Sequence, residues 1–246
     1  MGLTVTVLGS SGSFAGPGNA CSGYLVSSRD ANVWLDCGPG TLANLQEHIA
    51  LEDLTAIVVS HSHPDHWGEL PVLYNALRYY IERAGTPVYG TAETLARVEG
   101  ARGDAVTPAF DWHTIADTSR FAIDHLELCC SLTDHPVETL AIRIDDSEDG
   151  GSFGYSADTA AGWSLTSLGE GLDLLFCEAT LRADDESGAP HLKTSQAGED
   201  ARRATPSRLV ITHLPPGADV EAYRSETAEA FGRDVEVALP HMRFLT

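Results

Sequence analysis

The order of apolar and polar positions predicts that strands and helices alternate along the chain. Runs typical of strands occur at 3–9, 24–28, 32–38, 54–60, 87–90, 121–132, 138–144, 152–158, 172–179 and 208–213, and a further one ends the chain. Helical spacing occurs at 40–49, 68–85, 92–100, 160–168, 196–204 and 219–231. We expect a hairpin from the second and third strands, a long helix closed by Gly85, and irregular chain over 100–118.

This order of elements predicts the fold class. Strands lead in each half of the chain and helices follow, which fits an α/β (α+β) fold of two mixed sheets packed face to face with helices outside. The length of 246 residues, 43% of them hydrophobic, suffices for one sizeable core and is short for two domains. Gly and Pro are spread along the chain instead of marking a linker. We therefore expect residues 1–246 to form a single domain.

The amino-acid composition limits the cellular compartments and the classes of binding partner to be considered. The net charge is -21, with Lys193 as the single lysine among 15 basic residues. Such a surface repels nucleic-acid backbones and anionic membranes, and it fits solubility or a salty habitat equally well. No apolar run approaches the ~20 residues that cross a bilayer. The chain shows no signal-peptide pattern, and its five cysteines include no C-x-x-C. We expect a cytoplasmic protein with reduced thiols. The sequence is compatible with a homodimer but does not determine the oligomeric state.

Candidate metal ligands follow the strand-like runs. An H-x-H-x-D-H motif comes directly after the apolar run 56–59, and three further His or Asp residues follow other runs. Because residues at strand ends project into loops on one rim, distant positions can converge there. Imidazole nitrogen and carboxylate oxygen bind zinc at about 2.0–2.2 Å. The alternative is that these are ordinary polar residues of loops. That interpretation would suit a single isolated histidine, but it does not account well for the H-x-H-x-D-H motif. The candidates are His61, His63, Asp65, His66, His135, Asp158 and His213.

These motifs resemble the metallo-β-lactamase superfamily, in particular its ribonuclease Z and cyclic-nucleotide phosphodiesterase branch. SHSHPDH is followed downstream by a His, an Asp and a His, as in that superfamily. WLDCGPGT (34–41) is similar to F-D-C-G-E-G-T, CEAT (177–180) to H-E-A-T with Cys177 in place of His, HLKTSQAG (191–198) to an H-S-T segment, and ITHLPP (211–216) to a T-H-I-S segment. The resemblance covers nearly the whole chain and implies a four-layer αββα sandwich with metals at one edge.

The resemblance also implies a cofactor and its ligands. The cofactor is a pair of divalent metal ions, zinc or else manganese. One ion is assigned to His61, His63 and His135, and the other to Asp65, His66 and His213, with Asp158 bridging both. Asp65 is further implied as the residue that orients the attacking water or accepts its proton. Two such ions activate water and clamp the oxygens of a displacement.

Glu178 and His191 are implied as a proton-donating pair, in which the carboxylate orients the imidazole that protonates a leaving alkoxide. A surface salt bridge is the alternative. Since a phosphodiester needs a general acid more than a β-lactam or thioester does, this pair favours phosphodiesters. Lys193, Thr194 and Ser195 precede or open a predicted helix whose N-terminus favours phosphate, although a plain solvated lysine fits as well.

The segment between the third histidine and the bridging acid indicates the substrate size. Ribonuclease Z proteins carry a long tRNA-gripping arm there, whereas here only residues 136–157 intervene, with one Arg. This favours a small phosphodiester such as a 3′,5′-cyclic nucleotide over tRNA. Alternatives are a ribonuclease Z-like endonuclease, a hydrolase of another ester or lactone on the same metals, and a non-catalytic metal-binding protein.

Two minor features complete the candidate site. The Gly/Ser loop GSSGSFAGPG is not a P-loop, because no G-K-[ST] follows, and we expect a tight turn near the metal rim. Tyr24, Trp67 and Trp112 could stack on a base, but packing is the more common role of an aromatic residue.

Overall fold

The computed structural model describes residues 2–246 and contains two seven-stranded sheets. The first sheet has the spatial order β14 (Arg243–Leu245), β1 (Thr4–Gly9), β2 (Gly23–Ser28), β3 (Ala31–Leu35), β4 (Ala56–Val58), β5 (Thr86–Gly90) and β6 (Phe110–Thr114). The second has the order β13 (Glu236–Val237), β12 (Arg208–Thr212), β11 (Leu174–Glu178), β10 (Ser152–Tyr155), β9 (Leu140–Asp146), β8 (Leu126–Leu132) and β7 (Arg120–Ile123). Each sheet mixes parallel and antiparallel pairs, which confirms the predicted fold class.

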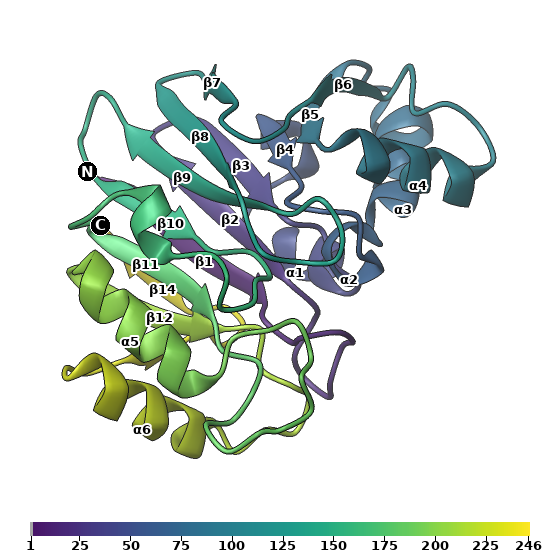
Figure 1. Ribbon diagram of the computed structural model, residues 1–246. Helices are drawn as coiled ribbons and strands as arrows, with labels where there is room; N and C mark the ends of the chain where they lie inside the picture. The colour runs from purple at the N-terminus through teal and green to yellow at the C-terminus, as the bar shows by residue number, and fades with distance from the viewer. Residues whose placement is uncertain (1) are drawn as a thin grey trace.

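Helices cover the outer face of each sheet (Figure 1). The first sheet carries α1 (Thr41–Leu45), α2 (Pro64–Trp67), α3 (Leu70–Asn75) and α4 (Ala92–Arg102), and the second carries α5 (Thr194–Ala204) and α6 (Val220–Phe231). Shorter turns are η1 (Leu51–Asp53), the π-helix η2 (Ala76–Ile81) and η3 (Leu165–Leu168). Across residues 2–246, no helix has the length and apolar character that crossing a membrane requires.

Three apolar clusters fill the spaces between these layers. One joins residues of both sheets, and the other two join each sheet to its own helices. In β4, Val58 belongs to the cluster between the sheets, whereas Ile57 belongs to the cluster under the helices. In β11, Phe176 likewise belongs to the cluster between the sheets, and Leu175 to the cluster under the helices of the second sheet. Because successive side chains of a strand point to opposite faces, continuous apolar runs such as these form strands buried on both sides.

Several predicted elements differ in their boundaries. The helix expected over 68–85 changes from α3 into the π-helix η2 and ends at Glu82, which adopts a left-handed conformation (φ 58°), before Gly85 is reached. The strand expected over 121–132 is a hairpin, β7 and β8, that turns at Asp124 (φ 52°). Asp tolerates this conformation better than most residues because its short side chain can bond locally. Both turns depend on non-glycine residues with positive φ, which apolar periodicity does not reveal.

The remaining predicted elements can be compared with the observed strand pairing and helix boundaries. The segment predicted to be irregular contains β6, which pairs in parallel with β5. The helix predicted at 160–168 is only the short turn η3, and α5 begins at Thr194, earlier than expected. The expected hairpin of β2 and β3 is confirmed by their antiparallel pairing. The C-terminal segment supplies two short strands, β13 and β14, to different sheets.

Parallel pairing brings the ends of several strands to one edge. In the second sheet β10, β11 and β12 run parallel, and β8 has the same direction because it is separated from β10 by the antiparallel β9. In the first sheet β3, β4 and β5 are parallel. Two hydrogen bonds join the sheets near this edge, from Tyr155 Oη to Asp36 Oδ2 (2.9 Å) and between Tyr24 Oη and Thr212 Oγ1 (2.6 Å). The loops after these strands therefore meet at a common rim.

The contact between α5 and α6 gives a stability prediction. A Cβ atom at Gly198 of α5 would lie 2.5 Å from the backbone oxygen of Thr227, whereas one at Gly100 of α4 would meet nothing within 4 Å. We expect Gly198→Ala to destabilise the fold by about 1–3 kcal/mol through overpacking. The control Gly100→Ala should stabilise it by roughly 0.5–1 kcal/mol, because Gly disfavours helices. Urea unfolding midpoints measure both, and shifts of the same sign would contradict this packing.

Candidate metal centre

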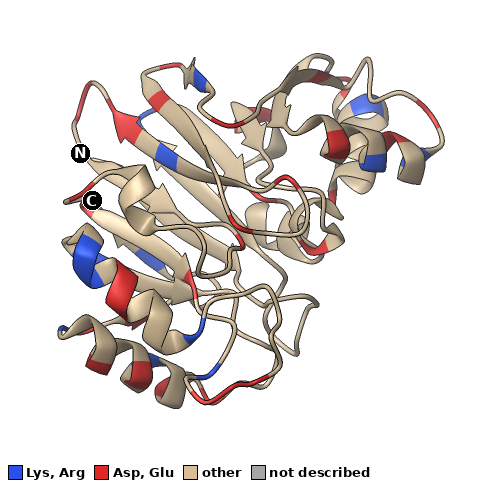
Figure 2. Ribbon diagram, viewed as in Figure 1, with Lys and Arg blue, Asp and Glu red and all other residues tan. Residues whose placement is uncertain are grey.

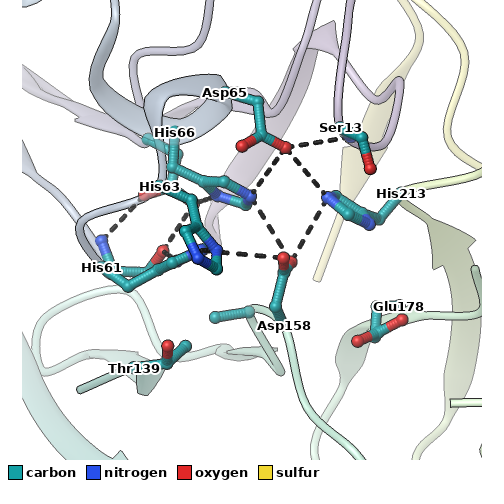
Figure 3. A network of polar contacts seen from close by, with 12 residues as sticks. Ser13, His61, His63, Asp65, His66, Thr139, Asp158, Glu178 and His213 are labelled. Atoms are coloured by element: carbon teal, nitrogen blue, oxygen red, sulfur yellow. Dashed lines mark hydrogen bonds and ion pairs between the residues drawn. The ribbon is translucent and has the colours of Figure 1, made fainter. Parts of the chain in front are cut away.

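The seven predicted ligands converge at the common rim, and Figure 3 labels all of them except His135. Two groups of these side chains have ligand atoms that all lie within 4.8 Å of one another, and so does a third group formed by Asp158, His191 and His213. His61, His66, Asp158 and His213 are buried, and the remaining three are half-buried. The first group is His61, His63, His135 and Asp158, and the second is Asp65, His66 and His213.

The first group surrounds a point with three nitrogens and one oxygen. His63 Nδ1 lies 3.1 Å from both His61 Nε2 and His135 Nε2. Asp158 Oδ2 lies 3.7 Å from His61 Nε2 and 3.9 Å from His135 Nε2. Ligands that share one cation at about 2 Å are separated by distances of this order. The four side chains can therefore hold a divalent ion.

The second group is built around the other oxygen of the same aspartate. Asp158 Oδ1 lies 3.4 Å from both His66 Nε2 and His213 Nε2. Asp65 Oδ2 lies 3.4 Å from His213 Nε2 and 3.6 Å from His66 Nε2. Since Oδ2 of Asp158 faces the first group and Oδ1 the second, this carboxylate is placed to bridge two ions.

Unpartnered buried atoms support this fit. His66 Nε2 and Asp158 Oδ1 are buried and have no hydrogen-bond partner. Leaving such atoms unsatisfied costs free energy, so a buried site with this donor set fits a cation. Over residues 2–246, the ion-pair contacts of Asp65 and Asp158 are all with histidines, so no Lys or Arg neutralises them. The cluster thus fits a dinuclear metal site.

Four of the imidazoles use Nδ1 to bind the protein, which directs Nε2 toward the cluster. The partners of Nδ1 are Ser60 Oγ for His61 (3.0 Å), Asp36 Oδ2 for His66 (2.7 Å), Pro190 O for His135 (3.1 Å) and Thr180 Oγ1 for His213 (2.9 Å). Such contacts set the tautomer and orientation of a metal-binding histidine. The cluster is therefore oriented by the protein itself.

The two hydroxyl groups determine the direction of these bonds. Ser60 Oγ donates to Asp36 (2.9 Å), and Thr180 Oγ1 donates to Glu178 (2.6 Å). A hydroxyl has one proton, so each must accept from the neighbouring imidazole Nδ1–H. In the neutral tautomer that this bonding selects, Nε2 of each ring carries the lone pair that binds metal.

Asp36 is a site residue that the sequence analysis missed. Its buried carboxylate accepts hydrogen bonds from His66 Nδ1, Tyr155 Oη and both the amide and the hydroxyl of Ser60. In the sequence, the stretch WLDCGPGT is informative only through its family resemblance. Asp36 nevertheless comes at the end of a strand, directly after β3, as Asp158 comes shortly after β10, and this similar position could have identified it.

The predicted pair of Glu178 and His191 is present. His191 Nδ1 donates to Glu178 Oε1 (2.9 Å), which also accepts from the amide of Thr159 (2.7 Å). Glu178 is fully buried and His191 lies against the rings of His135 and His213, at centroid distances of 5.4 and 5.3 Å. The surface salt bridge considered from the sequence is therefore wrong. Through Thr180, the same carboxylate also orients His213.

The site has an uneven distribution of charge. Burial lowers the pKa of His61, His63 and His135, which keeps them neutral. Burial opposes the charged form of His66 as well, but Asp158, Asp36 and Asp65 raise its pKa well above the usual value. The pKa of His191 is also raised against the effect of burial, by its hydrogen bond to Glu178. The second group thus lies in a field that favours cations.

The predicted phosphate-binding residues lie at the start of α5. The amide of Lys193 donates to Gln196 Oε1 (2.9 Å) in front of the first turn. Thr194 is buried, and its hydroxyl donates to Glu226 of α6 (2.7 Å), so it serves the contact between these helices. Lys193 and Ser195 are half-buried. Binding of substrate by these three residues stays a prediction.

The Gly/Ser loop does lie at the rim, as expected. The amide of Ser13 donates to Asp65 Oδ2 (2.9 Å), and Figure 3 shows Ser13 beside Asp65 and His213. A Cβ atom on Gly12 would lie only 2.9 Å from His213 Nδ1. The sequence signal was the glycine-rich turn itself, although it did not reveal which ligands the loop touches.

Known proteins are similar to this chain over most of its length. Residues 31–214 match the family model described as the beta-lactamase superfamily domain. An uncharacterized protein of Mycobacterium tuberculosis is 32% identical over 247 residues, covering 96% of this chain and 90% of that protein. "Probable metallo-hydrolase YhfI" of Bacillus subtilis is 29% identical, covering 96% and 97%. Ribonuclease Z of Mycobacterium bovis is 26% identical, covering 96% and 95%.

Solved structures extend the comparison. The crystal structure of YhfI has a TM-score of 0.88 at 28% identity and covers 99% of both chains. Yeast PDE1 has a TM-score of 0.72 at 12% identity, covering 100% of this chain and 99% of the other. At that identity the likeness concerns the fold alone.

The bridging position of Asp158 can be tested by metal content. Asp158→Ala should lose at least one ion while the fold persists, because one residue would serve both ions. Affinity should fall by more than the 10–100-fold typical of changes outside the ligand set. Elemental analysis after dialysis against limiting zinc measures this, with Asp111→Ala on the exposed face of β6 as the control. Retention of two ions by Asp158→Ala would contradict the assignment.

The hydroxyl relay through Thr180 gives a finer prediction. Thr180→Val keeps the shape but removes the acceptor of His213 Nδ1–H, so zinc affinity of one site should fall about 10–100-fold. Thr180→Ser retains the hydroxyl and should bind zinc like the wild type. Competition titration with a chromophoric chelator measures both variants. Equal affinity in Thr180→Val and the wild type would show that the relay does not orient His213.

Proposed function

The chain belongs to the β-lactamase superfamily, and we propose that within it the protein is a dinuclear-metal phosphodiesterase acting on a small substrate such as a 3′,5′-cyclic nucleotide. At the coarser level it is a metallo-hydrolase of this superfamily. The observation that carries the finer proposal is the buried pair of Glu178 and His191 beside the His/Asp cluster. A positioned proton donor is required when the leaving group is an alkoxide.

The atom types of the seven candidate ligands indicate which metal ions the site would bind. We propose zinc, with manganese as the alternative, because imidazole nitrogens and carboxylate oxygens suit both. When bound, such ions lower the pKa of water and neutralise charge on the phosphate. The residues of the chain then hold the ions and the substrate in one orientation, which converts attack into an effectively unimolecular step.

The protein groups divide the proton transfers between them. Water attacks phosphorus, and Asp65, whose Oδ2 is held by the amide of Ser13, accepts the proton that water loses. The bond between phosphorus and the ribose oxygen breaks on the opposite side. His191 donates its Nε2 proton to that oxygen, while Nδ1 stays bonded to Glu178. Water has been added across one P–O bond, which gives a phosphomonoester and a free hydroxyl.

The surroundings of the site favour a small substrate over a polynucleotide. Loop residues 10–19 contain no Lys or Arg. The segment 136–157 forms β9 and β10, and its single Arg143 forms two hydrogen bonds to Asp145 (2.7 and 2.8 Å), so its charge is already paired. Figure 2 shows Lys and Arg scattered among acidic positions in this view, without a basic face. Since phosphate contacts supply most non-specific nucleic-acid affinity, long polyanions are disfavoured.

The general-acid role gives the test of this proposal. His191→Ala should lower kcat/KM for cyclic AMP by about 10²–10⁴-fold, because a ribose alkoxide departs poorly without a proton. Bis-p-nitrophenyl phosphate should lose little, because p-nitrophenolate leaves without protonation. Both substrates are assayed in the wild type, in His191→Ala and in the control His113→Ala, which alters an exposed histidine of β6. Metal content is measured for each.

The alternatives have distinct results in the same assays. Equal losses on both substrates, with reduced metal content, would make His191 a ligand, since its ring nitrogen also lies within 4.8 Å of ligand atoms of Asp158 and His213. Turnover of a lactone without turnover of any phosphodiester would favour another ester hydrolase. Binding of metal without turnover of bis-p-nitrophenyl phosphate would favour a non-catalytic protein.

A further inference from the structure

A loop that contacts the metal centre also carries an exposed aromatic residue. Residues 10–19 contact the second ligand group through Ser13, whose amide donates to Asp65 Oδ2 (2.9 Å). The amide of Gly12 donates to the backbone oxygen of Leu214 (2.9 Å), directly after His213. Gly12 also lies so close to His213 that it leaves no room for a side chain. The loop position is thus coupled to two candidate ligands.

Phe14 follows these contacts, and its main chain is held on both sides. Its amide donates to the backbone oxygen of Gly12 (2.7 Å), and its own backbone oxygen accepts from the hydroxyl of Ser11 (2.8 Å). Between them Ser13 has a φ of 62°, a left-handed conformation that is uncommon for serine. Strained residues of this kind persist where the surrounding structure holds them, and they cluster at functional sites.

The side chain of Phe14 has no such support. It is 64% exposed although its backbone is fixed, so the ring has little packing within the protein. Adjacent Cα atoms are about 3.8 Å apart, which keeps Phe14 close to the Ser13 amide that contacts Asp65. A ring presented in this way can bind an aromatic group at low entropic cost, because the loop is already ordered.

The other aromatic candidates do not compete for this role. Tyr24 and Trp67, considered from the sequence, belong to buried core clusters. Trp112 lies against Gly90 in the first sheet. Tyr80 is more exposed than Phe14, at 86%, but it lies on η2, outside the ligand groups. Exposure alone is common for single apolar residues. Exposure on a loop bonded to the ligand set distinguishes Phe14.

We propose that Phe14 is the platform on which the aromatic base of the substrate stacks, so that this site selects nucleoside phosphates over base-free sugar phosphates. The inference rests on the proposed function, since it concerns the substrate of the same centre. Stacking on an aromatic ring tolerates any base, because every base has a π-face. The platform therefore sets the class of substrate and leaves the choice among bases to other contacts.

Binding and turnover test the platform separately. Calorimetry compares AMP with ribose 5-phosphate on the zinc-loaded wild type, and kinetics compare cyclic AMP with 1-deoxyribose 3′,5′-cyclic phosphate. Phe14→Ala and Phe14→Leu should weaken AMP binding and lower kcat/KM on cyclic AMP by roughly 5- to 100-fold, chiefly through KM. The base-free compounds should change little. Phe14→Trp should restore the preference, and Tyr80→Ala serves as the control.

The outcomes separate this inference from the proposed function. If the wild type binds AMP no more tightly than ribose 5-phosphate, or if Phe14→Ala weakens both ligands equally, the platform is refuted. If no phosphodiester is hydrolysed but the preference for AMP exists and is lost in Phe14→Ala, the proposed reaction fails while the platform stands. Phe14→Leu binding AMP as well as the wild type would also refute stacking, since leucine keeps apolar bulk without a π-face.

Discussion

Two buried carboxylates, those of Asp36 and Glu178, impose the constraint on which the centre depends. A carboxylate withdrawn from water must be surrounded by donors, and in both cases the donors include imidazole and hydroxyl groups of the site. Each acid holds one histidine directly and orients a second through a hydroxyl. The pairs are His66 and His61 for Asp36, and His191 and His213 for Glu178. Disturbing either acid would therefore misdirect two rings at once.

The same hydrogen bonds connect the sheets to the centre. Asp36 follows β3 of the first sheet, but it accepts a hydrogen bond from the hydroxyl of Tyr155 at the end of β10 in the second. Asp158 lies just beyond that tyrosine and reaches His66 on α2. Because packed interiors deform little, this link keeps ligands from the two sheets at the separations that shared cations need. The αββα architecture thus provides the rigid frame of a site that neither sheet forms alone.

Charge and shape then restrict what the site can accept. The chain carries a net charge of -21, and the one Arg between His135 and Asp158 is paired with an acid. Positive charge at the rim would come mainly from the bound ions, which suits a single phosphate group better than a polyanion. The neutral loop 10–19 adds backbone amides and the ring of Phe14. These features belong together in the proposed action on a small nucleoside phosphodiester.

Much of this protein was readable from its sequence, and the rest required tertiary structure. Periodicity predicted the two-sheet fold, because strands buried on both faces have continuous apolar runs. The spacing from His61 to His66 indicated a metal site, because few other functions need that motif. Local pattern could not reveal Asp36 as a partner of His66, or that Glu178 is buried and also orients His213 through Thr180. These relations join residues distant in sequence, and only the register of the strands and the packing of the two sheets bring them within hydrogen-bonding distance.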